Sequence, residues 1–167
     1  MITSNISLGI NVDIDPTSDI NNVKLGNNVK ISKHSSVFGS PSHPVEVDND
    51  TKISSACFVN GYDAPVKIGA RCGISRQTHI MSGSAPWSEK LRKIFPVVKE
   101  PICIGDDCWI GADCIIAPGV TLGDFCIVAA NSFVNKSFPA YSIIGGNPAK
   151  LIRMLTEEER KTILSDD

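Results

Sequence analysis

The sequence of 167 residues has no excess of charge of one sign, no long apolar run and few aromatic residues. Lysine and arginine number 16 against 18 acidic residues, which gives a formal net charge of −2. This balance offers no basic field for nucleic acid and no polybasic stripe for a membrane surface. No apolar run reaches the length of a membrane span, and no basic-then-apolar leader opens the chain. We therefore expect a soluble cytoplasmic protein, a single domain over 1–167, that binds a small molecule.

The six cysteines form no C-x-x-C pair anywhere in the chain. This absence argues against a zinc site built on such pairs and against the disulfide framework of a small secreted domain. Five of them share one place in the repeat described next, the fourth residue after an aliphatic one: Cys57, Cys72, Cys108, Cys114 and Cys126. Because free cysteine is commonly buried, we interpret these five as small core side chains.

An aliphatic residue recurs at every sixth position along most of the chain. The longest unbroken series is Ile104, Ile110, Ile116, Leu122, Val128 and Val134. The same register occurs upstream in three sets of three: Leu25, Ile31 and Val37; Val47, Ile53 and Val59; Ile68, Ile74 and Ile80. Neither the helical period of 3.6 nor the strand period of 2 fits the sequence better.

Three hexapeptides make one coil of a triangular parallel β-helix, in which each coil buries its aliphatic residues by stacking on the next. The sets begin at Leu25, Val47, Ile68, Ile104 and Leu122, at intervals of 22, 21, 36 and 18 residues. Insertions of 4, 3, 18 and 0 residues thus extend an 18-residue coil. The sequence predicts an all-β solenoid, with an imperfect first coil at Ile14 and Ile20 and with residues 1–12 unassigned.

Two segments depart from the repeat. The longest insertion runs from Met81 to about Pro101 and predicts a protruding loop, either a functional lid or a solvated loop that Trp87 pins down. Near the other end, Thr156-Glu157-Glu158-Glu159 is a capping-box pattern. It predicts a short C-terminal helix over 156–164, which we expect to cover the last coil.

Three motifs resemble those of the galactoside, maltose and polysaccharide O-acetyltransferases, which are hexapeptide-repeat acyltransferases. They are Cys108-Trp109-Ile110-Gly111, Ala117-Pro118-Gly119-Val120-Thr121-Leu122-Gly123 and Gly145-Gly146-Asn147-Pro148-Ala149-Lys150-Leu151-Ile152-Arg153. The likeness covers 66–153, and the last motif is its most specific part. It implies left-handed coils, acetyl-CoA as donor without a metal, and a donor groove between two subunits of a homotrimer.

The resemblance also implies which residues contact acetyl-CoA. Those expected around the thioester and the pantetheine arm are Trp109, Gly111, Ala112, Ala129 and Ala130. Those expected near the nucleotide phosphates are Asn135, Lys136, Lys150 and Arg153. Cations beside a phosphate make physical sense, although Lys150 and Arg153 could equally form an exposed basic tail.

The mechanism of the family requires a histidine that takes the proton of the acceptor hydroxyl, while backbone N–H groups hold the oxyanion. The family's spacing to the tryptophan equivalent to Trp109 places that histidine at Ala85. Three explanations stay open: a deliberate histidine-to-alanine change, a natural loss of the base, or a shifted loop that lets His79 serve. We favour the first, because the other motifs of the site are retained.

The acceptor side is marked by Phe58-Val59-Asn60-Gly61-Tyr62-Asp63, which resembles a family segment that contacts sugar hydroxyls. Asn60 and Asp63 are candidates, although such a turn is equally ordinary as structure. Trp87 and Tyr62 could stack on a pyranose. We expect an O-acetyltransferase that acts on a sugar of a surface polysaccharide or glycoside, with N-acetylation open.

Three alternatives share the scaffold. A streptogramin-type xenobiotic acetyltransferase has a similar loop start, but usually a longer C-terminal extension. A γ-type carbonic anhydrase needs three histidines around zinc, and of His34, His43 and His79 only His79 lies near a plausible site. A non-catalytic β-helix binding module would use the loop to contact a partner.

Overall fold

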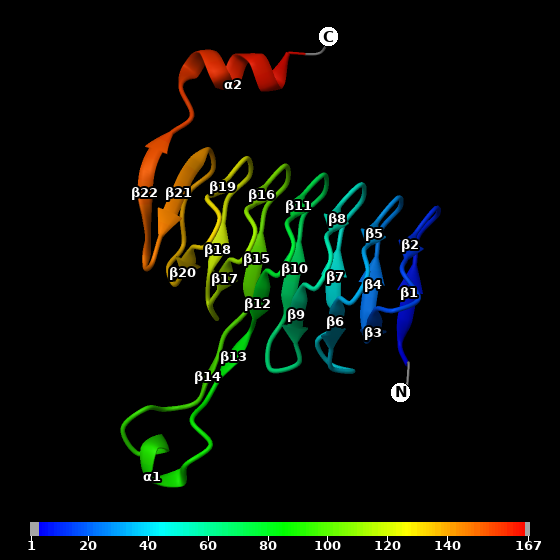
Figure 1. Ribbon diagram of the computed structural model, residues 1–167, viewed down its shortest axis with the longest axis vertical. Coiled ribbons are helices and arrows are strands. Elements are labelled where there is room, and N and C mark those ends of the chain that lie inside the picture. Colours follow the sequence, from blue (N-terminus) through cyan, green and yellow to red (C-terminus); the bar gives the residue numbers. More distant parts are fainter. Residues whose placement is uncertain (1–3, 166–167) are drawn as a thin grey trace.

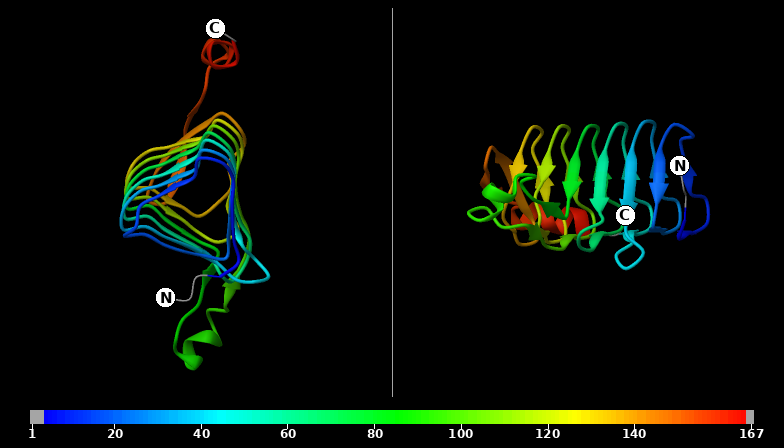
Figure 2. Two further views of the ribbon diagram at one scale, coloured as in Figure 1. Left: turned by 90° about the vertical axis from the view of Figure 1, so that its right-hand side faces the viewer. Right: turned by 90° about the horizontal axis from the view of Figure 1, so that it is seen from below.

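The computed structural model describes residues 4–165 as a stack of short parallel strands (Figure 1). Three parallel sheets form the walls of a triangular tube (Figure 2). The first sheet contains β1 (Ile6–Leu8), β4 (Val23–Leu25), β7 (Val45–Val47), β10 (Val66–Ile68), β15 (Ile102–Ile104) and β18 (Thr121–Leu122). The second contains β2 (Asp13–Ile14), β5 (Lys30–Ile31), β8 (Lys52–Ile53), β11 (Gly73–Ile74), β16 (Trp109–Ile110), β19 (Ile127–Val128), β21 (Ser142–Gly146) and β22 (Ala149–Met154). The third contains β3 (Asp19–Asn21), β6 (Ser36–Gly39), β9 (Phe58–Gly61), β12 (His79–Met81), β17 (Ile115–Ile116) and β20 (Phe133–Val134).

The aliphatic residues of the repeat point into the tube and stack in register. In the second sheet, Ile74 pairs with Ile53 on one side and Ile110 on the other, and all three are at most 1 % exposed. Their neighbours along each strand lie on the outer face, because side chains alternate across a strand. The predicted solenoid is confirmed, with one continuous core along its axis.

At several of the fourth residues after an aliphatic one, a buried thiol or hydroxyl donates to a carbonyl of the next coil. Thr51 Oγ1 donates to Gly69 O at 2.7 Å, and Cys72 Sγ donates to Gly105 O at 3.1 Å. The five cysteines of the repeat are buried, as predicted. They also donate hydrogen bonds across coils in the place of serine or threonine, which was not predicted. Desolvation raises the pKa of the Cys57 thiol, which keeps it protonated and able to donate.

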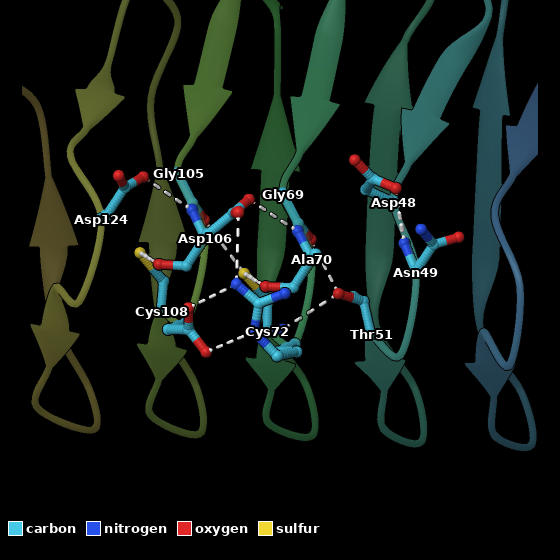
Figure 3. Close-up of polar contacts among 12 residues, drawn as sticks. Asp48, Asn49, Thr51, Gly69, Ala70, Cys72, Gly105, Asp106, Cys108 and Asp124 are labelled. Carbon is cyan, nitrogen blue, oxygen red and sulfur yellow. Dashed lines mark hydrogen bonds and ion pairs between the residues drawn. The ribbon is translucent and has the colours of Figure 1, made fainter. Parts of the chain in front are cut away.

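A ladder of side-chain acceptors runs along the corner between the first and second sheets (Figure 3). Asp124 Oδ1 accepts from the Asp106 N–H, and Asp106 Oδ1 accepts from the Ala70 N–H, each at 2.9 Å. The next rung would need an acceptor on residue 70, which is alanine. There the Asn49 N–H donates to Asp48 Oδ1 at 2.7 Å instead. The ladder therefore has one interruption, where a local bond substitutes for the cross-coil bond.

The first coil extends further toward the N-terminus than predicted. Strand β1 lies inside the segment that the sequence left unassigned and pairs in parallel with β4. Leu8 continues the six-residue register of Ile14 and Ile20, but it is 50 % exposed because it stacks on one neighbouring coil only. The start and end of the single domain predicted over 1–167 fall outside the described residues.

The long insertion leaves the tube where the third sheet ends (Figures 1 and 2). Its base is a two-stranded antiparallel stalk of β13 (Gly83–Ser84) and β14 (Val98–Lys99), and its tip carries α1 (Glu89–Arg92). None of the residues of α1 is buried. The predicted protruding loop is confirmed.

The C-terminal segment has the predicted helix in an unexpected place. Thr156 and Glu159 form the reciprocal capping box, and α2 (Glu157–Leu164) follows. The helix does not cover the last coil: none of its residues is buried, and it lies beside the tube with its axis along the stack (Figure 2). That expectation was wrong, because β22 turns back antiparallel on β21 and itself ends the second sheet.

Candidate functional site

A hollow of about 350 Å³ lies on the outer face of the second sheet, where β16 and β19 end. The residues that line it are Ser75, Trp109, Gly111, Ala112, Ile127, Val128, Ala129 and Ala130. All five residues predicted around the thioester and pantetheine arm are therefore brought together. We call this cavity the donor hollow. None of its lining side chains is charged, so it suits a neutral, largely apolar group.

The floor of the donor hollow depends on close backbone approach at Gly111. A Cβ at this position would lie 2.5 Å from the Ala130 nitrogen and 2.8 Å from the Val128 oxygen. The Gly111 N–H donates to Val128 O at 2.8 Å, which holds the two turns together. Only glycine permits that approach, because real Cβ atoms essentially never come under 3.0 Å.

Two backbone N–H groups belong to residues that line the hollow. Within residues 4–165, the N–H groups of Ala112 and Ala130 donate to no backbone acceptor, whereas the carbonyl of Ala112 accepts from Asn131 N at 2.8 Å. Neutral N–H groups without an acceptor are suited to an oxygen on which negative charge develops.

Trp109 forms one wall of the donor hollow and is 60 % exposed. Its Nε1 donates to Ser75 Oγ at 3.3 Å, which fixes the plane of the ring. A second hollow of about 630 Å³ lies on its other side, between the second sheet and α2, with Phe125, Leu155 and Ile163 among its lining residues. This second hollow was not predicted, because the sequence does not indicate that α2 lies beside the sheet.

The four residues predicted near the phosphates do not form one cluster in a single chain. Asn135 and Lys136 follow β20 of the third sheet, whereas Lys150 and Arg153 belong to β22 of the second sheet. Lys136 Nζ lies 5.4 Å from the centre of the Phe138 ring.

Arg153 is engaged within the chain. Its Nη1 and Nη2 donate to the two carboxylate oxygens of Glu159 at 2.7 and 2.8 Å. This pairing lowers the pKa of Glu159 to about 2 and raises the pKa of Arg153. A phosphate could bind Arg153 only by competing with Glu159 for the same N–H groups.

The predicted catalytic position, Ala85, directly follows β13 at the base of the loop. His79 is held elsewhere, on the outer face of β12, paired in register with Phe58 and Ile115. Its ring centre lies 5.8 Å from that of Phe58. A movement of the loop begins after Met81, so it would leave His79 in the sheet.

The acceptor candidates gather at the corner from which the loop leaves. Asn60 Oδ1 accepts from the Tyr62 N–H at 2.9 Å. Asp63 Oδ1 forms an ion pair with Lys99 Nζ at 2.8 Å and packs against Gly83, so it fastens the base of the loop. Trp87 lies further out and is 94 % exposed.

The donor hollow and Ala85 lie at opposite ends of the third sheet. The hollow is made by the turns that lead into β17 and β20, whereas Ala85 comes after β12 has ended. About five residues of extended chain separate the two ends, or roughly 17 Å at ~3.3 Å per residue. One chain alone does not bring the two together.

Two other features, a metal-binding cluster and a membrane-spanning helix, are absent from the described residues. No group of three or more His, Cys, Asp or Glu in residues 4–165 is arranged to hold a metal ion. In the same range, no helix has both the length and the apolar character needed to cross a membrane.

Comparison with known proteins gives the following relatives. Residues 101–136 match the family described as the hexapeptide repeat of succinyl-transferase. The putative colanic acid biosynthesis acetyltransferase WcaF of Escherichia coli is 40% identical over 94 residues, covering 56% of this chain and 50% of that protein. The galactoside O-acetyltransferase of E. coli is 32% identical over 104 residues, and the match covers 62% of this chain and 51% of that protein. The chain spans about half the length of these curated relatives.

Among solved structures, the N-acyltransferase AntD of Bacillus cereus, in complex with dTDP and 3-hydroxybutyryl-CoA, superposes with a TM-score of 0.81. The match covers 94% of this chain and 87% of AntD at 23% identity, so it supports the fold alone. That fold is the left-handed parallel β-helix, in which the sequence period predicted the solenoid and the family resemblance implied the handedness. By its repeat, its fold and these curated relatives, the chain is similar to the hexapeptide-repeat acetyltransferases.

Proposed function

We propose that the protein is an acetyl-CoA-dependent acetyltransferase whose acceptor is a sugar of a surface polysaccharide or glycoside. The observation that carries this proposal is the donor hollow, an uncharged cavity with the N–H groups of Ala112 and Ala130 at its rim. Such a cavity suits a thioester and its pantetheine arm, and N–H donors stabilise the oxyanion of acyl transfer. The named activities of WcaF and the galactoside O-acetyltransferase support a sugar acceptor.

In this proposal the active site forms between two copies of the chain in a homotrimer. Ala85 and the donor hollow lie too far apart to act within one copy, so the loop of one subunit would meet the hollow of the next. The loop carries side chains suited to such a contact: Trp87, Ile94 and Phe95 are 94 %, 68 % and 61 % exposed. Exposed large apolar side chains gathered on one segment commonly mark an interaction site.

The acetyl group would move in one direct step. The acceptor oxygen attacks the thioester carbon, the carbonyl oxygen gains negative charge beside the two N–H groups, and CoA leaves as thiol or thiolate. A hydroxyl acceptor must lose its proton during this attack, and position 85 offers no base. The chain is therefore expected to bind the donor and to transfer acetyl to a hydroxyl slowly.

Amine acceptors form a second candidate class, favoured by Ala85 itself. A neutral amine has a free electron pair and attacks before any proton is removed, so it depends less on a base at position 85. Amines of this kind are partly neutral near pH 7 to 8, as an α-amino group is. An amino sugar would then be acetylated by this chain as it stands.

Donor binding is tested by thermal unfolding with and without CoA. At a hundred times Kd, a ligand that binds only the folded state adds about 2.7 kcal/mol to the free energy of unfolding. Ala112→Trp fills the donor hollow and should abolish this stabilisation. Ser55→Trp, which changes the equivalent turn position two coils away, should retain it. Equal stabilisation of both variants, or none in the unchanged protein, would contradict the proposed donor site.

The acceptor class is tested with Ala85→His and two sugars, a galactoside and a matched amino sugar. If the acceptor is a hydroxyl, the variant should gain roughly 10²–10⁴ in rate with the galactoside. If the acceptor is an amine, the unchanged chain should already acetylate the amino sugar and the substitution should add little. If the protein binds CoA but acetylates neither sugar, the result would favour a non-catalytic binding module.

A further inference from the structure

A third hollow, of about 440 Å³, lies near the N-terminal end of the tube, apart from the donor hollow, and shares only Tyr62 with the acceptor candidates described above. It is lined by Asp19, Ile20, Asn21, Asn22, Ser36, Phe38, Gly39 and Tyr62. These residues come from β3, from Asn22 directly after it, from β6 and from the insertion that follows β9. The cavity therefore lies on the first three coils, whereas the donor hollow lies on coils close to the C-terminus. We call it the N-terminal hollow.

One of its lining residues carries an unsatisfied buried acceptor. Asn22 is 5 % exposed and its Nδ2 donates to Gly39 O at 3.3 Å. Its Oδ1 is buried and has no hydrogen-bond partner within the described residues. Buried polar atoms normally find a partner, and an orphan calls for an explanation such as a bound water or ligand. A donor that enters the hollow could supply that partner.

The other side chains combine flat rings with neutral and acidic hydrogen-bonding groups. Tyr62 is 60 % exposed, so most of its ring is free for contact. The Phe38 ring is fixed by an edge-to-face contact with Phe58, with ring centres 5.4 Å apart. Asp19 supplies a carboxylate, Asn21 an amide and Ser36 a hydroxyl. Rings that take an apolar face, beside polar groups that take hydroxyls, suit a pyranose.

A column of outward side chains leads from the N-terminal hollow to the loop. Phe38 pairs with Asn60, and Asn60 pairs with Met81, the residue at which the third sheet gives way to the loop. These are two steps between neighbouring coils, or roughly 10 Å at ~4.8 Å per step. A ligand that occupies the hollow and reaches the loop must therefore be longer than one sugar.

We propose that the N-terminal hollow binds one pyranose of an extended glycan, whose next units run along this column toward the loop. The link to the loop rests on the function proposed above, since the unit to be acetylated would lie there. Binding in the hollow itself needs neither CoA nor acetyl transfer. The protein would thus select a polysaccharide or long oligosaccharide over a free monosaccharide.

The test is NMR titration of the uniformly 15N-labelled full chain, without CoA, using galactose-, glucose- and mannose-based tetrasaccharides and the three monosaccharides. We expect at least one tetrasaccharide to bind at least tenfold more tightly than its monosaccharide and to shift the side-chain amide signal of Asn22. Tyr62→Ala and Asp19→Asn should each weaken that binding about tenfold or more. Tyr62→Phe, which keeps the ring, should retain it.

Asp13→Asn is the matched control, because Asp13 is an exposed carboxylate of the same coil on the second sheet. It should leave tetrasaccharide binding unchanged. Thermal unfolding of each variant verifies that it folds. We expect all of them to fold, because Asp19 and Tyr62 are exposed. Absence of binding by all three tetrasaccharides, or binding that Tyr62→Ala and Asp19→Asn leave intact, would overturn the proposal. Loss of CoA binding in the earlier experiment would leave this titration unaffected, so the two proposals fail separately.

Discussion

Gly111 gives the sharpest residue-scale prediction, because the structure offers a matched glycine beside it. Gly111→Ala should destabilise the fold by about 1–3 kcal/mol, the usual cost of overpacking, and should weaken CoA binding. Gly73→Ala changes the same sheet where an added Cβ meets only Trp109 Cδ1, at 3.8 Å, and should be nearly neutral. Urea unfolding of the two variants measures the difference. Equal stability of the two variants would mean that the turns beneath the donor hollow can move apart to accommodate the added methyl group.

Glu159 predicts how the C-terminal segment responds to acid. Its pKa falls from 4.5 to about 2 because Arg153 stabilises the carboxylate. A carboxylate with a lowered folded-state pKa stabilises the protein fully above its unfolded pKa. That contribution is lost as pH falls from about 4.5 to about 2. Glu159→Gln should therefore lower the unfolding temperature at pH 7 and make no difference near pH 2.

Glu157→Gln, in the same turn of α2, controls for the general loss of an acidic residue at a helix N-terminus. The prediction concerns the difference between the two variants, measured by circular dichroism between pH 2 and 7. If both variants behave alike at pH 7, the pair with Arg153 contributes nothing measurable, as many exposed pairs do.

The cysteines show what could and could not be predicted for single residues. Their place in the repeat predicted burial, because the fourth residue after each aliphatic one faces inward. Their hydrogen bonds to the next coil could not be predicted, since these depend on the rise between coils and on the carbonyl above each thiol. Ala85 illustrates the opposite case: a resemblance assigned it a role, and the structure shows only where it lies.

At the scale of one element, the acceptor ladder predicts that its interruption can be repaired. Ala70→Asn would place an amide oxygen where the Asn49 N–H could reach it, as Asn49 Oδ1 itself accepts from Asn27 N at 2.7 Å. The gain is expected to be small, up to about 1 kcal/mol, because Asp48 already accepts from that N–H.

A double-mutant cycle separates this bond from general effects. Asp48→Ala should cost stability in the unchanged chain, where Asp48 is the acceptor. The same substitution should cost less in the Ala70→Asn background, where the new amide takes over. Thermal unfolding of the four proteins gives the coupling, and strict additivity would show that the introduced amide does not reach the Asn49 N–H.

Elements that repeat were predictable, and elements that do not repeat were less so. The six-residue register predicted three sheets, and Ile53, Ile74 and Ile110 stack in one of them because stacking leaves one way to bury these residues. Strand β1 was not predicted, although Leu8 lies six residues before Ile14, because an exposed end coil carries the repeat less clearly than the coils within the stack. The capping box located the start of α2 but not its direction, which depends on how β22 turns back.

At the scale of the whole molecule, the separation of Ala85 from the donor hollow predicts complementation between chains. One chain carries Ala85→His together with Ala112→Trp, so it has a base and a blocked hollow. The other keeps both positions unchanged, so it has a hollow and no base. With a galactoside as acceptor, co-expressed chains should exceed both separate preparations by about tenfold or more.

Two measurements complete this experiment. Native mass spectrometry should show a trimer of the 17.9 kDa chain and mixed species after co-expression. If mixed trimers form and activity stays at the level of the separate proteins, the active site is not shared between copies. The N-terminal hollow could not have been foreseen at this scale, because its residues occupy outward positions on which the repeat places no demand.

The two ends of the tube differ, and this difference has a consequence for how such a protein can change in length. Strand β22 folds back and closes the second sheet at one end, whereas β1, β2 and β3 are the outermost strands at the other. Their outer edges can accept hydrogen bonds from a further parallel coil. A further coil could therefore pair with all three sheets at the N-terminal end, whereas β22 blocks the second sheet at the other end, and such an addition would leave the register of every later coil unchanged.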